Sequence, residues 1–159
     1  MLSKSNMLKR LKIFVVFLTS IIVFFLFEVL FSKINIDRLS NSIENILFAL
    51  LLIVMSFLFN SEKAKRYYLI IALSLFNVFL FFETFYYHHF KGIFSDSALF
   101  VILESNGSET KEFLTSYFNL KIAFLFIITL LLIVFALKQI DRCIKSISAY
   151  KLRKVMALF

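Results

Sequence analysis

Two carboxylates, Glu28 and Glu83, lie within long apolar segments of the sequence. An ionisable group at membrane depth is costly to bury, so it suggests a function by default. Each carboxylate lies about five residues before the end of its apolar segment. In one interpretation, both line a polar cavity that is open at one membrane surface and suits a lipid headgroup. In the other, each reaches the headgroup region or pairs with a nearby Lys or Tyr.

A second concentration of reactive side chains lies in the segment ILESNGSETKEFL, residues 102–114. Its three carboxylates, Glu104, Glu109 and Glu112, can hold an ammonium group, and its hydroxyl groups can donate hydrogen bonds to a phosphate. The alternative is a solvated surface helix, in which Asn106 is the N-cap and Glu109 completes a capping box.

The histidines and the cysteine offer no metal site. His88 and His89 are adjacent, so they do not share a helical face and make a poor ligand pair. Cys143 is the only cysteine, which excludes an internal disulfide. The sequence contains no Gly-rich phosphate loop and no nucleophile elbow. We therefore expect no metal, no cofactor and no catalytic residue in this chain.

The elements that position these side chains are apolar helices. Of the 159 residues, 61% are hydrophobic and 23 are Phe, a composition that does not suit a soluble domain. A spanning helix needs about 20 apolar residues. The sequence predicts an all-α membrane protein whose spans cover four segments: residues 13–32, 43–60, 67–87 and 121–138.

The basic residues predict the orientation of these four spans. With the N-terminus in the cytoplasm, 13 of the 18 Lys and Arg residues lie on the cytoplasmic side. This bias follows the positive-inside rule and favours a topology with both termini inside. The net charge of +8 is then explained by topology and anionic lipids rather than by nucleic acid. We expect a multi-pass protein of a bacterial inner membrane.

Two connecting segments carry further expectations. Residues 32–45 are predicted to form a short polar outer loop. The periplasmic loop, residues 88–120, is predicted to hold two short amphipathic helices that lie in the membrane interface. Residues 1–137 form the transmembrane domain in this scheme. Residues 138–159 form a basic cytoplasmic tail that turns apolar at its end, like the approach to a truncated fifth helix.

The segments ETFYYHHFKGIFSDSA (residues 83–98) and ILESNGSETKEFL (residues 102–114) resemble the membrane domain of bacterial phosphoethanolamine transferases. That family has five spanning helices, followed by a periplasmic zinc-dependent domain of the alkaline-phosphatase and sulfatase type. A Thr nucleophile in that domain transfers phosphoethanolamine from phosphatidylethanolamine to lipid A, lipooligosaccharide or similar acceptors. The resemblance covers the whole chain in layout, and about thirty residues in detail.

The resemblance implies a headgroup site in the periplasmic loop. Glu109 matches a family Glu and would face the ammonium group, while Ser105 replaces a Thr, keeps its hydroxyl and would lie near the phosphate. Asn106, between them, is included in this substrate-binding set. Val101 stands where the family has Asn, which is a departure. Glu28 and Glu83 are candidate cavity-lining residues.

The nucleophile and the zinc ligands of the family have no counterpart in this sequence. The resemblance therefore implies that the chain anchors the enzyme, helps to bind the donor lipid and is inactive alone. It would be a fragment, a split or truncated gene product whose catalytic domain is encoded separately, or a stand-alone remnant. Two other functions stay open. The chain could be a small four-helix transporter subunit in which Glu28 and Glu83 are coupling groups, or a non-catalytic membrane interaction protein.

Overall fold

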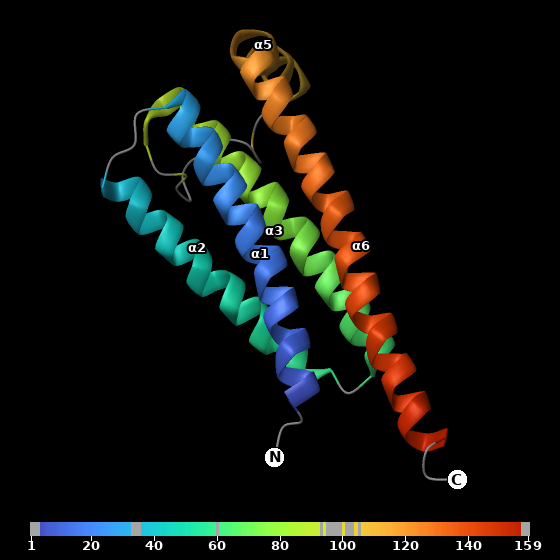
Figure 1. Cartoon of the computed structure of the whole chain (residues 1–159). Helices are drawn as coiled ribbons and strands as arrows, with labels where there is room; N and C mark the ends of the chain where they lie inside the picture. Colours follow the sequence, from blue (N-terminus) through green and yellow to red (C-terminus); the bar gives the residue numbers. More distant parts are fainter. Residues whose placement is uncertain are drawn as a thin grey trace.

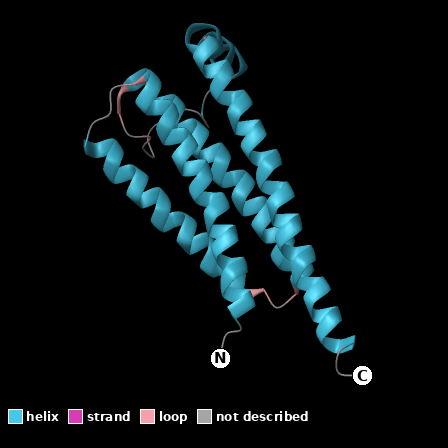
Figure 2. Cartoon of the chain, in the orientation of Figure 1, coloured by secondary structure: helices cyan, strands magenta, loops and turns pink. Residues whose placement is uncertain are grey.

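The computed structural model describes residues 4–32, 36–59, 61–92, 94, 100, 104 and 106–156. The described residues form helices and no strand, as predicted (Figure 2). The elements in chain order are α1 (Lys4–Phe31), α2 (Ile36–Met55), the 3-10 turn η1 (Ser56–Leu58), α3 (Glu62–Phe90), α5 (Gly107–Tyr117) and α6 (Leu120–Met156).

Four of these helices are long and apolar enough to cross a membrane, which confirms the predicted number of spans. The candidate spans are Lys12–Phe31, Arg38–Met55, Glu62–Phe90 and Leu120–Ile140. Both termini and the α2–α3 connection lie at one end of the bundle, and α5 lies at the opposite end (Figure 1). The end that carries α5 is called the α5 end below.

Local sequence signals explain where several helices begin and end. Ser61 caps α3 by accepting a hydrogen bond from the backbone N–H of Ala64. Lys91 ends the helix in the left-handed conformation, with φ of 55°, and its N–H donates to the carbonyl of Tyr87. Asn119 caps α6, since its Oδ1 accepts from the N–H of Ile122 at 3.1 Å. These caps satisfy backbone groups that would otherwise lack partners at helix ends.

The core lies where α1, α3 and α6 meet. Phe17, Phe24 and Phe76 are among its largest fully buried side chains, and the Phe17 and Phe76 rings lie 5.3 Å apart. Helix α3 packs along α6, and α1 contacts each of the other three long helices. Helix α2 packs mainly on α1 and diverges from α3 toward the α5 end (Figure 1). Helix α2 therefore approaches α1 more closely than it approaches α3.

Helix α2 differs from the prediction. It begins at Ile36, not near residue 43, and ends at Met55, not near residue 60. Most of the predicted polar outer loop, residues 32–45, is therefore helix. The physical reason is that Arg38, Asn41 and Asn45 in this segment are buried against α1 and α3, where carboxylates accept their hydrogen bonds. Hydropathy alone does not register such pairing.

The C-terminal helix also differs from the prediction. Helix α6 continues past its apolar span to Met156, so the basic tail is a direct extension of the helix rather than a loop before a fifth helix. Residues 120–156 contain neither Gly nor Pro to interrupt it. Residues 157–159 lie outside the described residues, as does the greater part of the first predicted interfacial helix, over residues 98–103.

Candidate functional site

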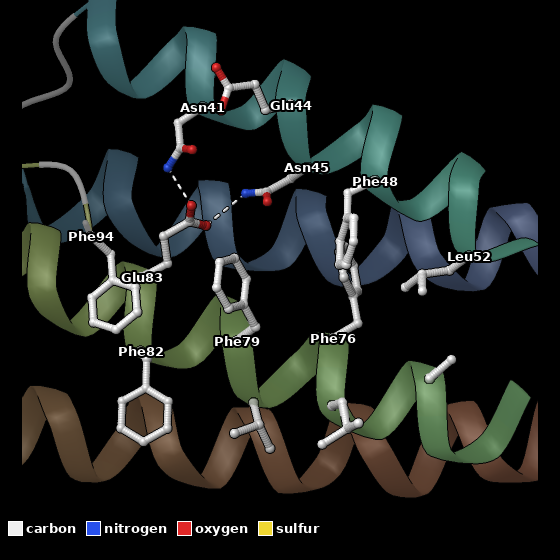
Figure 3. Close-up of a pocket in the computed structure, with 13 residues that line it drawn as sticks. Asn41, Glu44, Asn45, Phe48, Leu52, Phe76, Phe79, Phe82, Glu83 and Phe94 are labelled. Atoms are coloured by element: carbon white, nitrogen blue, oxygen red, sulfur yellow. Dashed lines mark hydrogen bonds between the residues drawn. The ribbon is translucent and has the colours of Figure 1, made fainter. Parts of the chain in front are cut away.

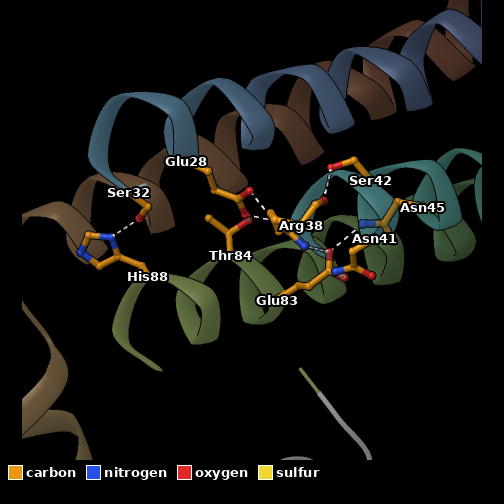
Figure 4. Close-up of polar contacts among 9 residues, drawn as sticks. All are labelled: Glu28, Ser32, Arg38, Asn41, Ser42, Asn45, Glu83, Thr84 and His88. Atoms are coloured by element: carbon orange, nitrogen blue, oxygen red, sulfur yellow. Dashed lines mark hydrogen bonds and ion pairs between the residues drawn. The ribbon is translucent and has the colours of Figure 1, made fainter. Parts of the chain in front are cut away.

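A buried ion-pair cluster joins α1, α2 and α3 near the α5 end of the bundle (Figure 4). Arg38 on α2 donates from Nε to Oε2 of Glu28 on α1 at 2.6 Å, and from Nη2 to Oε1 at 2.5 Å. Its Nη1 lies 3.3 Å from Oε2 of Glu83 on α3. Side-chain exposure is 0% for Glu28, 3% for Arg38 and 4% for Glu83. One guanidinium therefore bridges two carboxylates away from solvent.

Two amides of α2 complete the coordination of Glu83. Asn45 donates from Nδ2 to Oε2 of Glu83 at 2.7 Å, and Asn41 donates to Oε1. Arg38, Asn41 and Asn45 are three and then four residues apart, so they share one face of the helix. All three are buried. Through the amides of this polar stripe, the first turns of α2 are hydrogen-bonded to α3 although the two helices diverge there.

The second carboxylate, Glu28, has a further donor on α3. Thr84 donates from Oγ1 to Oε1 of Glu28 at 2.8 Å, and it is fully buried. The guanidinium carbon of Arg38 lies 5.6 Å from the centre of the Tyr87 ring, within cation–π range. Each charged group of the cluster thus has several partners, as burial of charge requires.

The charges of the cluster do not cancel when all three groups are ionised. Arg38 supplies one positive charge, while Glu28 and Glu83 supply two negative charges. Glu44, one turn away from Asn41 on α2, is exposed and adds a third carboxylate nearby. In a medium of low dielectric constant, an excess of negative charge strongly favours a cation. The cluster therefore has the electrostatics of a site for a cationic group.

A groove of about 700 Å³ opens between α2 and α3 beside this cluster (Figure 3). Its polar end is formed by Asn41, Glu44, Asn45 and Glu83, and the rest is apolar. The apolar lining is dominated by aromatic rings and comprises Phe48, Leu52, Ala72, Leu75, Phe76, Val78, Phe79, Phe82 and Phe94. The groove thus combines a long apolar wall with carboxylates at one end, which matches a molecule that has a hydrocarbon part and a cationic part.

The residues predicted to bind a headgroup in the loop, Asn106 and Glu109, form a helix cap. The Oδ1 atom of Asn106 accepts from the N–H groups of Ser108 and Glu109, at 3.1 and 3.0 Å. Glu109 returns the contact, since Oε2 accepts from the backbone N–H of Asn106 at 3.2 Å and Oε1 from its side-chain amide at 2.9 Å. This arrangement confirms the predicted capping box, at the start of α5. Ser105 lies outside the described residues.

The structure keeps the loop residues apart from the buried cluster. Asn106 and Glu109 are exposed at the start of α5, whereas Glu28 and Glu83 are buried among the spanning helices. Of the predicted site residues, the structure brings together Glu28 and Glu83. The two interpretations of Glu28 and Glu83 given above do not include Arg38 as their partner, because the sequence predicts a loop at Arg38. The spacing of Arg38, Asn41 and Asn45 on one helical face was the available signal.

The histidines at the end of α3 have other partners. The Nδ1 atom of His88 lies 2.9 Å from Oγ of Ser32, which follows α1. The His89 ring lies 5.3 Å from the ring of Tyr117, at the end of α5. Within the described part of the chain, no three His, Cys, Asp or Glu residues gather as metal ligands do.

Comparison with known proteins identifies no relative. No family model, no curated protein and no solved structure matches the chain. The functional interpretation therefore rests on the buried cluster, the groove beside it and the chemistry of their side chains.

Proposed function

We propose that this chain is a membrane domain that holds a phospholipid with a primary ammonium head, phosphatidylethanolamine, in the groove between α2 and α3. An acyl chain lies along the Phe-lined wall, and the ammonium group lies near Glu83 and Glu44. The observation that carries this proposal is the placement of Glu83 and the exposed Glu44 at the polar end of an apolar groove, beside a cluster that has one guanidinium for two buried carboxylates. The groove volume is within the range of about 300–1,000 Å³ that is usual for ligand sites.

The geometry favours Glu83 over Glu109 as the principal ammonium partner. Glu83 is 3% exposed and lines the groove, whereas Glu109 is exposed at the start of α5. A charge in a low-dielectric groove attracts a cation far more strongly than a solvated charge does. In this proposal, Asn106 and Glu109 form the cap of α5 and are not the ammonium partners.

The proposed orientation in the membrane places the α5 end outside. The positive-inside bias of the sequence supports cytoplasmic termini, which puts the polar end of the groove in the outer leaflet of the inner membrane. Fusing a reporter enzyme that is active only outside the cytoplasm at Ser108 tests this orientation. We expect the fused enzyme to be active. An inactive fusion, together with activity of a second reporter that works only in the cytoplasm when it is fused at the same residue, would refute the outward placement.

The resemblance to phosphoethanolamine transferases supplies the proposed biological role. The chain would anchor such an enzyme and present the donor lipid to a catalytic domain, which would use zinc and a Thr nucleophile to modify lipid A or lipooligosaccharide. The contribution of this chain is then the binding and orientation of the donor.

Lipid selectivity provides the direct test. The purified chain is exchanged into a mixture of equal parts of phosphatidylethanolamine, phosphatidylcholine and phosphatidylglycerol, and the retained lipids are identified by native mass spectrometry. We expect phosphatidylethanolamine to be enriched, because choline has no N–H to donate and glycerol has no positive charge. A charge-assisted hydrogen bond contributes about 1.5–3 kcal/mol, so Glu83→Gln and Glu44→Gln should each lower the enrichment about tenfold or more.

The matched control is Glu112→Gln, which removes an exposed carboxylate from α5. This variant has the same change in charge and is expected to keep the enrichment of phosphatidylethanolamine. Equal retention of the three lipids by the unaltered chain would refute the proposal. So would losses of enrichment in Glu83→Gln and Glu44→Gln that are no larger than the loss in the control.

A second candidate function is favoured by the depth of the ion-pair cluster. Ionisable groups buried in spanning helices occur in proton and cation pathways, and Glu28, Arg38 and Glu83 are all buried here. In this alternative, the chain is a transporter subunit and Glu83 is a coupling group. Proton- or cation-coupled flux in liposomes, abolished by Glu83→Gln, would favour it over lipid binding.

A further inference from the structure

A second group of charged side chains lies at the α5 end, separate from the groove. Lys91 follows the last residue of α3, and Lys121 lies in the first turn of α6. Their Nζ atoms lie 5.9 Å from the Tyr87 ring centre and 5.6 Å from the Phe31 ring centre, respectively. Lys91 follows His88 by three residues, and Phe31, the ring below Lys121, precedes Ser32, whose Oγ lies 2.9 Å from Nδ1 of His88. The end of α3 and the start of α6 thus supply two ammonium groups and an imidazole at this end of the bundle.

The position of Lys121 is the unusual feature of this group. A helix N-terminus carries a partial positive charge, so a lysine in the first turn is electrostatically unfavourable. The first turn of α6 contains no acidic residue that would compensate it. No ion pair joins Lys91 or Lys121 to a carboxylate within the portion of the chain that the structure describes. The positive charge at this end is therefore available to an anion from outside the chain.

The hydrogen bond between Ser32 and His88 determines which ring nitrogen of His88 can donate to a ligand. When the Ser32 hydroxyl donates to Nδ1, the neutral imidazole holds its proton on Nε2. The Nε2–H group is then a donor that Ser32 does not use. Two ammonium groups beside an imidazole N–H suit an anion that has several oxygens, as phosphate does.

We propose that Lys91, Lys121 and His88 bind a phosphate group at the α5 end of the bundle. Lys91 and Lys121 supply charge from two helices, and His88 supplies a hydrogen bond between them. The phosphate is carried by a lipid headgroup or is free in solution. This site uses different residues from the groove, so it does not depend on the presence of an ethanolamine lipid there.

Phosphate binding is tested with the full chain in phosphatidylcholine nanodiscs that contain a minor fraction of phosphatidic acid. Native mass spectrometry measures how much phosphatidic acid is retained, and inorganic phosphate is added as a competitor. Each lysine near a membrane surface contributes about 1 kcal/mol to anion binding, so Lys91→Gln and Lys121→Gln should each lower retention about fivefold. Lys111→Gln, an exposed lysine of α5, is the matched control and should change retention little.

A conservative variant separates binding from folding. Lys121→Arg keeps the charge and is expected to retain phosphatidic acid, while its melting curve and that of Lys121→Gln should match the unaltered chain. Retention that inorganic phosphate displaces shows that a free phosphate group suffices, and retention that it does not displace identifies the lipid as the source. Either result supports the site. Losses no larger than those of Lys111→Gln would overturn it.

The two proposals can fail independently. Lys121→Gln should leave the enrichment of phosphatidylethanolamine unchanged, because Lys121 does not line the groove. Glu44→Gln should lower that enrichment and leave the retention of phosphatidic acid unchanged, because Glu44 lies on α2 and the phosphate site does not use it. Loss of both activities in either variant would show that the two sites are not separate.

Discussion

Arg38→Met is expected to be among the most damaging single substitutions in the bundle. Arg38 bridges Glu28 and Glu83, and its loss leaves two carboxylates buried in one cluster without their counter-ion. Removing one partner of a buried ion pair typically costs about 3–5 kcal/mol, because the remaining charge stays desolvated. Thr84 and the α2 amides still donate to the carboxylates, which holds the expected loss to this range.

The assay is unfolding by SDS in mixed micelles, followed by far-UV circular dichroism. We expect Arg38→Met to lower the free energy of unfolding by about 3–5 kcal/mol. Arg142→Met removes an exposed arginine of α6 and should change stability by no more than about 0.5 kcal/mol. Combining Arg38→Met with Glu28→Gln and Glu83→Gln neutralises the cluster and should recover much of the loss. A cost for Arg38→Met close to that of Arg142→Met would refute the electrostatic account.

Three further predictions concern single substitutions at other positions. Asn106→Ala removes the cap of α5 and should speed amide hydrogen exchange in its first turn, with a local cost of about 1 kcal/mol. Val78→Trp fills the groove and should lower phosphatidylethanolamine retention in native mass spectrometry, whereas Ile71→Trp, at an exposed position of α3 outside the groove, should not. Thr84→Val removes a buried donor to Glu28 and should lower the free energy of unfolding in SDS by about 1–3 kcal/mol.

The helices could be predicted from the sequence because long apolar segments have few stable alternatives in a membrane. The capping box at Asn106 and Glu109 was equally accessible, since it depends only on residues three positions apart. The beginning of α2 was not accessible to hydropathy. Residues 36–45 are polar enough to suggest a loop, and they are helical because their side chains pair with carboxylates on other helices.

Only the two carboxylates of the candidate site could be predicted from the sequence, for the same reason. Glu28 and Glu83 stand out because each interrupts an apolar segment, and their similar depth follows from the direction of their helices. Arg38 does not stand out, because its environment in the sequence is polar. Its burial depends on contacts with Glu28 and Glu83, which are 10 and 45 positions away in the sequence. No local pattern predicts which of several nearby basic side chains is buried.

Because α6 is one continuous helix, motion at one end of it is transmitted along its length. The helix extends 16 residues beyond its apolar span, which is roughly 24 Å at 1.5 Å per residue. A stiff rod of that length converts a change in angle at the membrane into a displacement of its tip. A tilt of about 10° at the bilayer surface would move Met156 by roughly 4 Å, from the same rise per residue. Rearrangement of α3, against which α6 packs, would therefore be transmitted to the end of the bundle opposite α5 as motion of this extension.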